Sequence, residues 1–370
     1  MDSLALAYRP RTFDDLVGQL AVQVFLRRMV ATGRIPTTLL FDGSRGTGKT
    51  TTARILAAAL NCQQDNKPCG TCPSCVATFD GSSLDVIEID AASNGGVDDV
   101  RALRQQLLYR QSGNYRVVIF DEAHSASAAA FNAWLKTLEE PPPQTVVIML
   151  TTEPHRIPDT IISRCVRFTF RRLTVADITA RLQTIVDAEG LTCEPSLLTL
   201  LAERADGAMR DAVMLLDQVS RVGVDTAEQY QRLIGHTDDA PHILSLLLNG
   251  DLPGAFAHLD DMLTRVADPR TVVSDLISVL RDVLVLRCDG DITKTGAARA
   301  RRQNLALAME PAAATAALAK VLWPLAVTSR VDDSRATLEL AVVMLAEVFK
   351  ATNPTRQPER INLAEMTKLS

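Results

Sequence analysis

The stretch TTLLFDGSRGTGKT, residues 37–50, decides the fold of the first half of this chain. Its first five residues, Thr37–Phe41, form a short and mainly apolar run, which predicts a buried strand. Two glycines that flank four residues follow, and then a lysine and a threonine, which is the spacing of a phosphate-binding loop. The loop comprises Gly43, Ser44, Arg45, Gly46, Thr47, Gly48, Lys49 and Thr50. The stretch therefore predicts a strand, a phosphate-binding loop and a helix in succession.

Each residue type in this loop has a chemical role in binding a nucleotide. Glycines let backbone N–H groups surround phosphates, and a helix that begins near Gly48 adds its positive end. Lys49 is expected to reach the β- and γ-phosphates of a nucleotide, and the Thr50 hydroxyl to bind Mg²⁺. The strand before the loop and the Ala- and Leu-rich helix predicted over Thr51–Leu60 argue against a chance glycine-rich turn.

The rest of the first half has the pattern of a parallel α/β sheet. Short apolar runs with little alternation are typical of strands buried on both faces, and they occur at Val86–Ile89, Val117–Phe120 and Val146–Leu150. A helix is predicted over Ala129–Leu138, and the prolines at 141–143 end it. We therefore expect an α/β domain over residues 1–173.

The second half carries helical patterns without strands. Apolar residues recur at helical spacing in 175–189, 196–204 and 209–221, and Thr174 with Asp177 predicts a capped helix start. We expect a small helical domain over 174–236, an all-helical domain over 237–352 and a polar, proline-containing tail over 353–370.

Composition narrows the class of protein. With 370 residues, 47% hydrophobic and 22% charged, the chain is globular and long enough for two or three domains. The net charge of −5 argues against a polybasic binder of nucleic acid. Residues 1–173 are the more basic part, with 19 Lys and Arg against 17 Asp and Glu, so any such contact should lie there. No uncharged apolar run reaches 18 residues and Met1-Asp2-Ser3 lacks a basic segment, so we expect a cytoplasmic protein without membrane span or signal peptide.

Two acids follow the predicted strand Val117–Phe120. Such a strand delivers Asp121 to the carboxyl edge of the sheet, where it can bind Mg²⁺. Glu122, one residue further, can polarise the attacking water as a general base. The pattern alone is weak, because buried strands often end in an acidic turn. Paired with a phosphate-binding loop about 70 residues earlier, it indicates a nucleotide hydrolase.

Four of the seven cysteines cluster within fourteen positions: Cys62, Cys69, Cys72 and Cys75. Four thiolates suit tetrahedral Zn²⁺ in a closed, structural site. An iron–sulfur cluster and free thiols are the alternatives, but the fourth cysteine lies upstream of the Cys-x₂-Cys-x₂-Cys run and no redox partner is apparent. The sequence therefore favours zinc.

Further stretches complete a recognisable set of motifs. They are Tyr8-Arg9-Pro10, Val17-Gly18-Gln19, Asp90-Ala91-Ala92-Ser93, Asp121-Glu122-Ala123-His124, Phe131–Pro142, Ser163-Arg164-Cys165, Gly207–Ala212 and Leu216-Asp217-Gln218. Together with the loop, they resemble the gamma/tau subunits of the bacterial DNA polymerase III clamp loader, which are AAA+ ATPases. The resemblance covers about residues 1–236 closely. It implies an AAA+ P-loop ATPase domain over 1–173 with a zinc module at about 62–75, a helical lid over 174–236 and a helical collar for oligomerisation over 237–352.

The resemblance also assigns roles by position. It places the adenine base at Tyr8, Arg9, Pro10, Val17 and Gly18, with Thr51 as a further nucleotide contact. Thr152, with Thr151, resembles a sensor near the γ-phosphate, and Arg210 a lid arginine that reports the nucleotide state. Arg164 resembles an arginine finger offered to the ATP of the neighbouring subunit. The same patterns allow simpler roles, in which the threonines end a strand, Arg210 pairs with Asp206 or Asp211, and Arg164 pairs with Asp159.

For the whole chain, the resemblance implies an ATP-driven motor that uses ATP, Mg²⁺ and Zn²⁺. It would load a ring-shaped sliding clamp onto primed DNA beside delta- and delta-prime-type subunits, in a pentamer attached to the replicative polymerase, with no membrane partner. DNA phosphates would meet helix N-termini, with Ser93–Val97, Arg101 and Lys136 as candidates. For His124, the sequence itself favours a structural role beside the acidic strand end over a catalytic one. A nucleotide-locked structural subunit and another AAA+ machine, such as a helicase loader, are the alternatives. The intact set Lys49, Thr50, Asp121 and Glu122 argues against the first, and the cysteine cluster and Ser163-Arg164-Cys165 against the second.

Overall fold

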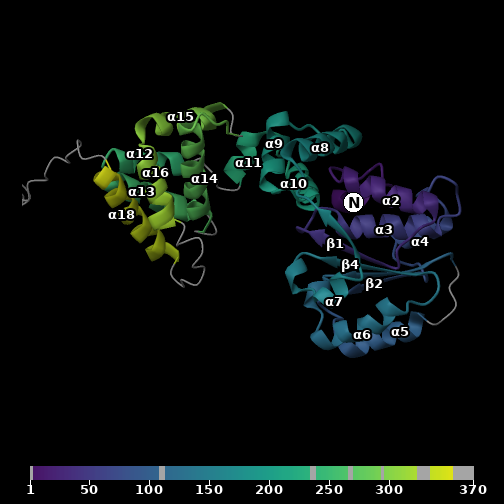
Figure 1. Cartoon of the computed structure of the whole chain (residues 1–370). Coiled ribbons are helices and arrows are strands. Elements are labelled where there is room, and N and C mark those ends of the chain that lie inside the picture. The colour runs from purple at the N-terminus through teal and green to yellow at the C-terminus, as the bar shows by residue number, and fades with distance from the viewer. Residues whose placement is uncertain are drawn as a thin grey trace, which may run out of the picture. The chain divides into compact units, whose positions relative to one another are not determined.

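A computed structural model describes residues 3–107, 113–233, 239–265, 270–292, 296–322 and 334–352. The chain divides into two compact units, Met1–Tyr230 and Gln231–Ser370 (Figure 1). Each unit is described here by itself. The predicted tail over 353–370 lies outside the described residues.

A five-stranded parallel sheet forms the centre of the first unit. Its strands lie in the order β2-β3-β4-β1-β5. They are β1 (Thr38–Gly43), β2 (Val86–Asp90), β3 (Arg116–Asp121), β4 (Thr145–Thr151) and β5 (Val166–Phe170). β3 and β4 are buried nearly throughout, as expected for central strands covered on both faces. The predicted parallel α/β sheet and its four predicted strands are confirmed.

The fifth strand was missing from the sequence prediction. β5 pairs only with β1 and forms one edge of the sheet. Along it only Phe168 and Phe170 are buried, while Val166, Arg167 and Thr169 are exposed. An edge strand with one buried face alternates polar and apolar residues, so it lacks the continuous apolar run that marks its neighbours.

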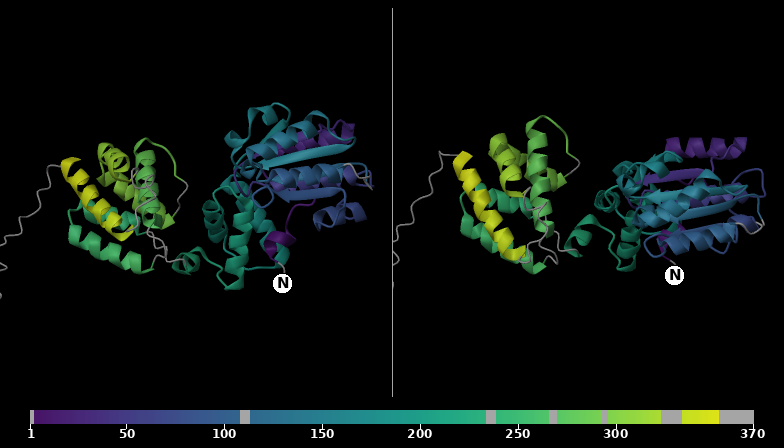
Figure 2. Two further views of the ribbon diagram at one scale, coloured as in Figure 1. Left: turned by 90° about the horizontal axis from the view of Figure 1, so that it is seen from below. Right: turned by 60° about the horizontal axis from the view of Figure 1, so that its bottom comes forward.

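Helices cover both faces of the sheet (Figures 1 and 2). On one face, α2 (Leu20–Thr32) and α3 (Lys49–Asn61) share a core with β1. On the other face, α5 (Val97–Leu107) and α6 (Ala128–Glu139) share a core that includes Phe131 and Trp134 of α6. The short elements are α1 (Leu4–Ala7), α4 (Pro73–Phe79), η1 (Ala123–Ser125), η2 (Pro154–Arg156) and α7 (Asp159–Ile162). This layering leaves the carboxyl ends of the strands open on one edge.

A small helical group completes the first unit. It comprises α8 (Val175–Glu189), α9 (Pro195–Arg204) and α10 (Met209–Arg221), and α11 (Ala227–Leu233) spans the boundary between the two units after Tyr230. The predicted cap is present, because Asp177 N donates to Thr174 Oγ1 at 3.1 Å and caps the start of α8. Helix α1 packs against α10, which brings the N-terminal segment beside this group. The domain border predicted at residue 174 stays a prediction, since both parts lie in one compact unit.

The described part of the second unit is helical throughout (Figure 2). It contains α12 (Ala240–Leu248), α13 (Leu252–Arg265), α14 (Arg270–Arg287), α15 (Gly296–Ala308), α16 (Pro311–Ala317), the π-helical turn η3 (Leu318–Leu322) and α18 (Ser334–Thr352). Leu, Val and Ala side chains from these helices form a single core. Among the described residues of both units, no helix is long and apolar enough to cross a membrane.

One ion pair is buried in this helical core. Arg302 Nε donates to Asp282 Oδ2 at 3.0 Å, and the two side chains are only 5% and 6% exposed. A charge held so far from water depends on its partner, because its hydration has been lost. The pair therefore links α14 to α15 in one arrangement.

We predict that Arg302→Met destabilises this unit by about 3–5 kcal/mol, because it removes the buried partner of the Asp282 carboxylate and leaves only the exposed Arg281, whose Nη2 lies 3.5 Å from Asp282 Oδ1. The double variant Asp282→Leu/Arg302→Met should recover most of the loss. Urea unfolding followed by circular dichroism measures both effects, with Arg335→Met in an exposed ion pair as the control, expected to change stability by less than about 1 kcal/mol. A single variant as stable as the control would contradict the prediction.

Candidate nucleotide site and cysteine cluster

A cavity of about 570 Å³ lies in the first unit, beside the loop that joins β1 to α3. Three parts of the chain enclose it: the N-terminal segment, the phosphate-binding loop and helix α10. The predicted residues that line it are Tyr8, Arg9, Pro10, Val17, Arg45, Gly46, Thr47, Gly48, Lys49, Thr50, Thr51, Asp121, Glu122 and Arg210. Gly18, Gly43, Ser44, Thr152 and Arg164 are predicted site residues that are not part of its lining.

The phosphate-binding loop folds around the ammonium of Lys49. The side chain is nearly buried, and Nζ donates to the carbonyl oxygens of Gly43 and Ser44 at 2.8 Å each. Burial lowers the pKa of Lys49, because the charged form has lost water and its two carbonyl partners are neutral. The carboxylates of Glu122, Asp121 and Asp42 oppose this shift only in part, so an anion in the loop would stabilise the ammonium further.

Thr50 and Asp121 meet across 71 residues of sequence. Thr50 Oγ1 donates to Asp121 Oδ2 at 2.8 Å, at the start of α3 and the end of β3. A hydroxyl and a carboxylate are oxygen ligands, which Mg²⁺ prefers, and the ion also keeps waters and substrate phosphates around it. This donor set fits the predicted magnesium ion, which these two residues would hold next to the phosphates.

Several cations converge on the cavity. Arg9, Arg45, Arg181 and Arg210 line it together with Lys49. Arg9 Nε donates to Thr51 Oγ1 at 3.3 Å, and burial together with the nearby cation of Arg54 lowers the pKa of Arg9. Positive charges placed close together in a partly closed site favour a polyanionic ligand. The lining therefore suits a nucleotide triphosphate better than a neutral molecule.

An apolar wall faces the N-terminal segment. Tyr8 and Val17 approach the cavity from that segment, and α10 contributes Met209, Val213 and Met214 on one face. Tyr8 Oη donates to Glu189 Oε1 at 2.7 Å, and this bond raises the pKa of Tyr8. The sequence interpretation missed the α10 side chains. Their 209, 213, 214 spacing on one helical face, with Met214 exposed, was the available signal.

Two glycines hold this arrangement by close approach. A Cβ at Gly46, whose φ is 76°, would lie 2.5 Å from Ala208 Cβ, so the phosphate-binding loop touches the residue before α10. A Cβ at Gly18, with φ 72°, would lie 2.3 Å from Leu173 Cδ2. Gly18 therefore sets the distance between the N-terminal segment and the end of the sheet domain and does not line the cavity.

Two other predicted residues, Thr152 and Arg164, lie outside the cavity lining, whereas Arg210 is part of it. Thr152 Oγ1 lies 3.4 Å from Glu122 Oε2, at the end of β4. Arg164 Nη2 donates to Glu139 Oε1 at 2.8 Å, so its ion-pair partner is Glu139 and the alternative pairing with Asp159 is wrong. For Arg210, the alternative partner Asp206 is bonded to Arg172 instead.

Acidic side chains partly cap the start of α5, which follows the segment predicted to contact DNA. Gly96 N donates to Asp99 Oδ2 at 3.0 Å, and Arg101 pairs with Asp98 at 3.1 Å. Both acids lie in the first turn of α5, where they would compete with a DNA phosphate for the same helix end. Among the residues that the structure describes at this helix start, there is thus no exposed cluster of basic side chains.

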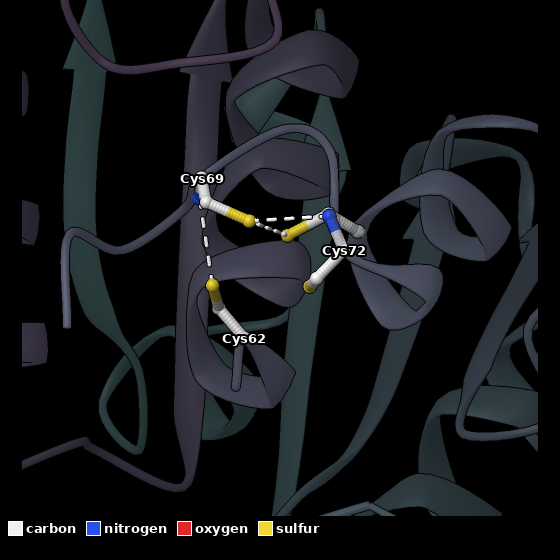
Figure 3. A group of neighbouring side chains, drawn as sticks. Cys62, Cys69 and Cys72 are labelled. Carbon is white, nitrogen blue, oxygen red and sulfur yellow. Dashed lines mark hydrogen bonds between the residues drawn. The ribbon is translucent and has the colours of Figure 1, made fainter. Parts of the chain in front are cut away.

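The four clustered cysteines converge on one point, and Figure 3 shows Cys62, Cys69 and Cys72. Cys62 follows α3, Cys69 lies on the loop, and Cys72 and Cys75 begin α4. The four sulfur atoms all lie within 4.8 Å of one another, and Cys69 Sγ is 4.0 Å from Cys75 Sγ. Sulfurs bound to one tetrahedral Zn²⁺ at about 2.3 Å are separated by similar distances. The cluster therefore fits a single zinc ion.

Backbone groups support the thiolate form in this cluster. Cys72 N donates to Cys69 Sγ at 3.2 Å, and Cys69 N donates to Cys62 Sγ at 3.4 Å. Backbone N–H groups of Thr71 and Cys72 lower the pKa of Cys69 to about 6. Burial raises the pKa of Cys75, so this thiol needs a cation nearby to become a ligand.

These features define the class of protein: an AAA+ P-loop ATPase domain with a helical lid. Residues 18–174 match the family model described as "DNA polymerase III, delta subunit", and residues 177–223 match "DNA polymerase III clamp loader subunit, ATPase lid domain". The two matches together cover more than half of the chain.

Named relatives agree with these matches. DNA polymerase III subunit tau of Bacillus subtilis is 41% identical over 298 residues, which are 77% of this chain and 52% of that protein. DNA polymerase III subunit gamma/tau of Mycobacterium tuberculosis is 39% identical over 316 residues, 83% of this chain and 55% of that protein. The chain therefore belongs to the family of DNA polymerase III clamp loader ATPase subunits.

The chain matches only part of the length of its named relatives. The chain spans about half the length of the two bacterial relatives it matches. Protein STICHEL-like 1 of Arabidopsis thaliana is 37% identical over 293 residues, 77% of this chain and 26% of that protein. The solved RuvB Holliday junction branch migration motor of Thermotoga maritima aligns with 70% of this chain and 88% of its own, at 18% identity and a TM-score of 0.47. A plant protein of another name thus shares this part of the chain.

We predict that Lys49→Ala lowers the affinity for ATP by at least 100-fold, because it removes the buried cation that faces the phosphates. Calorimetric titration with ATP measures the loss. Lys136→Ala removes the same charge from α6, away from the cavity lining, and should leave the affinity within twofold. Equal affinity of Lys49→Ala and the parent would refute the assignment of this loop.

For the cysteine cluster, we predict one zinc per chain and no iron in gently purified protein, because four thiolates leave no open position on the metal. Cys72→Ser should lose the zinc and destabilise the α4 loop, whereas Cys288→Ser, an exposed cysteine outside the cluster, should keep it. Elemental analysis of the three proteins checks this. Iron, or no metal, in the parent would count against it.

Proposed function

We propose that this chain is the ATP-driven motor subunit of a bacterial clamp loader, which loads a sliding clamp onto primed DNA. The observation that carries the proposal is the Thr50–Asp121 hydrogen bond beside the buried Lys49 ammonium, at the floor of a cavity that α10 borders. P-loop enzymes use these three groups for phosphoryl transfer: a hydroxyl and a carboxylate that hold Mg²⁺, and a lysine that contacts the phosphates.

Each polar group in the cavity has a role in this proposal. Lys49 and the loop amides bind the β- and γ-phosphates, and Thr50 with Asp121 holds Mg²⁺. Glu122 accepts a proton from the attacking water, and Thr152 and Arg210 respond to the γ-phosphate. A bound Mg²⁺ would neutralise charge that develops on the phosphate oxygens. Zinc at the cysteine cluster would be structural, because no ligand position is open to water.

The alternative of a nucleotide-locked structural subunit is less favoured. Such a subunit needs the phosphate-binding loop but not a general base. Here Glu122 lines the cavity, and its carboxylate is in contact with Thr152. Another AAA+ machine, such as a helicase loader, is also less favoured, because the lid over 177–223 matches the clamp loader family in particular.

Partners follow from the same proposal. The motor would act with delta- and delta-prime-type subunits in a pentamer, with the sliding clamp, primed DNA and the replicative polymerase complex, in the cytoplasm. The helical unit from Gln231 onward folds around its own apolar core, and in this proposal the collar region, 237–352, serves oligomerisation. DNA would be contacted through phosphates, without sequence selection.

Steady-state ATP hydrolysis measured with and without primed DNA and sliding clamp tests this function. We expect slow hydrolysis by the chain within the reconstituted assembly and a clear stimulation when both clamp and primed DNA are added. ATP binding without hydrolysis under all conditions would favour the structural subunit. Stimulation by unprimed DNA without clamp would favour another AAA+ machine.

Arg164 provides the sharpest test of action across a subunit boundary. It is partly exposed, lies outside the cavity lining and is paired with the exposed Glu139, so it can leave this partner at a free-energy cost below about 1 kcal/mol. We propose that its guanidinium meets the γ-phosphate in the next subunit, where such fingers contribute about 10³–10⁵-fold in rate.

We predict that Arg164→Ala binds ATP like the parent but loses most DNA-stimulated hydrolysis in the assembly. Mixing it with Lys49→Ala chains should restore some turnover, because one chain supplies the loop and the other the finger. Arg28→Ala, an exposed arginine on α2, is the control and should hydrolyse ATP at the parental rate. If Arg164→Ala also hydrolyses at that rate, the action across subunits is wrong.

A further inference from the structure

The carboxylate of Glu122 is restrained on one side only. The backbone of Glu122 has φ 48° and ψ 42°, a left-handed conformation that is unusual for a residue with a side chain. Its Oε2 lies 3.4 Å from Thr152 Oγ1 and 3.4 Å from His124 Nδ1. Within the part of the chain that the structure describes, Oε1 has no hydrogen-bond partner. One oxygen is therefore held while the other can accept a proton.

The ring of His124 is itself fixed from two directions. Its side chain is only 10% exposed. Nδ1 lies 3.2 Å from Thr151 Oγ1, and Nε2 lies 3.4 Å from Glu153 Oε1. Glu153 N donates to the same Thr151 hydroxyl oxygen at 3.0 Å, which ties the residue after Thr152 to the end of β4. The imidazole is thus held between the strand end and the carboxylate of Glu122.

We propose that His124 is a positioning residue for the general base, and that Glu153 orients its ring. The proposal rests on the proposed ATPase function and adds a residue to it. The hydroxyl of Thr152 has a single hydrogen, so it cannot donate to the γ-phosphate and to Glu122 at once. When Thr152 turns toward the phosphate, His124 Nδ1 remains as the neighbour of Glu122 Oε2. The other oxygen, Oε1, then stays directed to the attacking water.

If His124 positions Glu122, its replacement should lower the rate of ATP hydrolysis but leave the affinity for ATP nearly unchanged. His124→Ala should lower the rate of hydrolysis about 10- to 100-fold, because a misplaced base loses near-attack geometry. The affinity for ATP should stay within twofold, since His124 is not part of the cavity lining. His124→Asn should recover most of the rate, because its side-chain amide nitrogen can stand where Nδ1 stands. Single-turnover hydrolysis by the reconstituted assembly and calorimetric titration measure the two quantities.

His155 supplies a matched control. It also faces Glu153, with Nε2 3.7 Å from Oε2, but its side chain is 75% exposed, and among the described contacts none joins it to Glu122. His155→Ala should therefore hydrolyse ATP at the parental rate. A second measurement does not need activity: in urea unfolding, the midpoint shifts of His124→Ala and Glu122→Gln should be non-additive in the double variant, because the two side chains interact.

The outcomes separate this inference from the function on which it rests. Parental turnover by His124→Ala, an equal loss of ATP affinity and rate, or additive midpoint shifts would overturn the positioning role and leave the ATPase intact. If the parental assembly binds ATP but never hydrolyses it, the proposed function fails, and the unfolding cycle still decides whether His124 holds Glu122.

Discussion

The nucleotide site depends on the contacts that hold the buried ammonium of Lys49. It is only 7% exposed, and its two partners, the carbonyls of Gly43 and Ser44, carry no charge. Burial disfavours the protonated amine, and the carboxylates of Glu122, Asp121 and Asp42 offset this only in part, so a bound anion would stabilise the charged lysine further. The positive φ angles of Gly43, Gly46 and Gly48 allow the backbone to close around this group. The loop is therefore a preformed receptor for phosphate.

Strand order brings the remaining chemistry to the same place. β3, β4 and β1 are neighbours in the sheet, so their carboxyl ends lie side by side. They deliver the acids Asp121 and Glu122, the threonines 151 and 152, and the phosphate-binding loop, in that spatial order. Helix α10 borders the cavity with Arg210 and an apolar face, and the close contact of Gly46 with Ala208 joins this helix to the loop. A change at the phosphates can therefore reach the lid through direct contact.

The sequence was most informative where one local pattern determines the structure. Continuous apolar runs identified the three buried central strands β1, β3 and β4 and also the edge strand β2, and the Cys-x₂-Cys-x₂-Cys spacing identified the sulfur cluster. The edge strand β5 was missed because its alternating residues face the core on one side only. The sequence also could not predict contacts that form when distant segments pack together. These are the ion pair of Arg164 with Glu139 and the apolar wall of α10 opposite Tyr8. The meeting of Thr50 and Asp121 was predictable, because it follows from parallel strands alone.

A crystal structure of the chain with a non-hydrolysable ATP analogue and Mg²⁺ tests the assignment of this cavity most directly. We predict that the phosphates lie against the loop amides, that Lys49 Nζ exchanges the carbonyls of Gly43 and Ser44 for phosphate oxygens, and that the metal separates Thr50 from Asp121. A nucleotide bound elsewhere, or a Lys49 that still donates to both carbonyls with the nucleotide present, would contradict it.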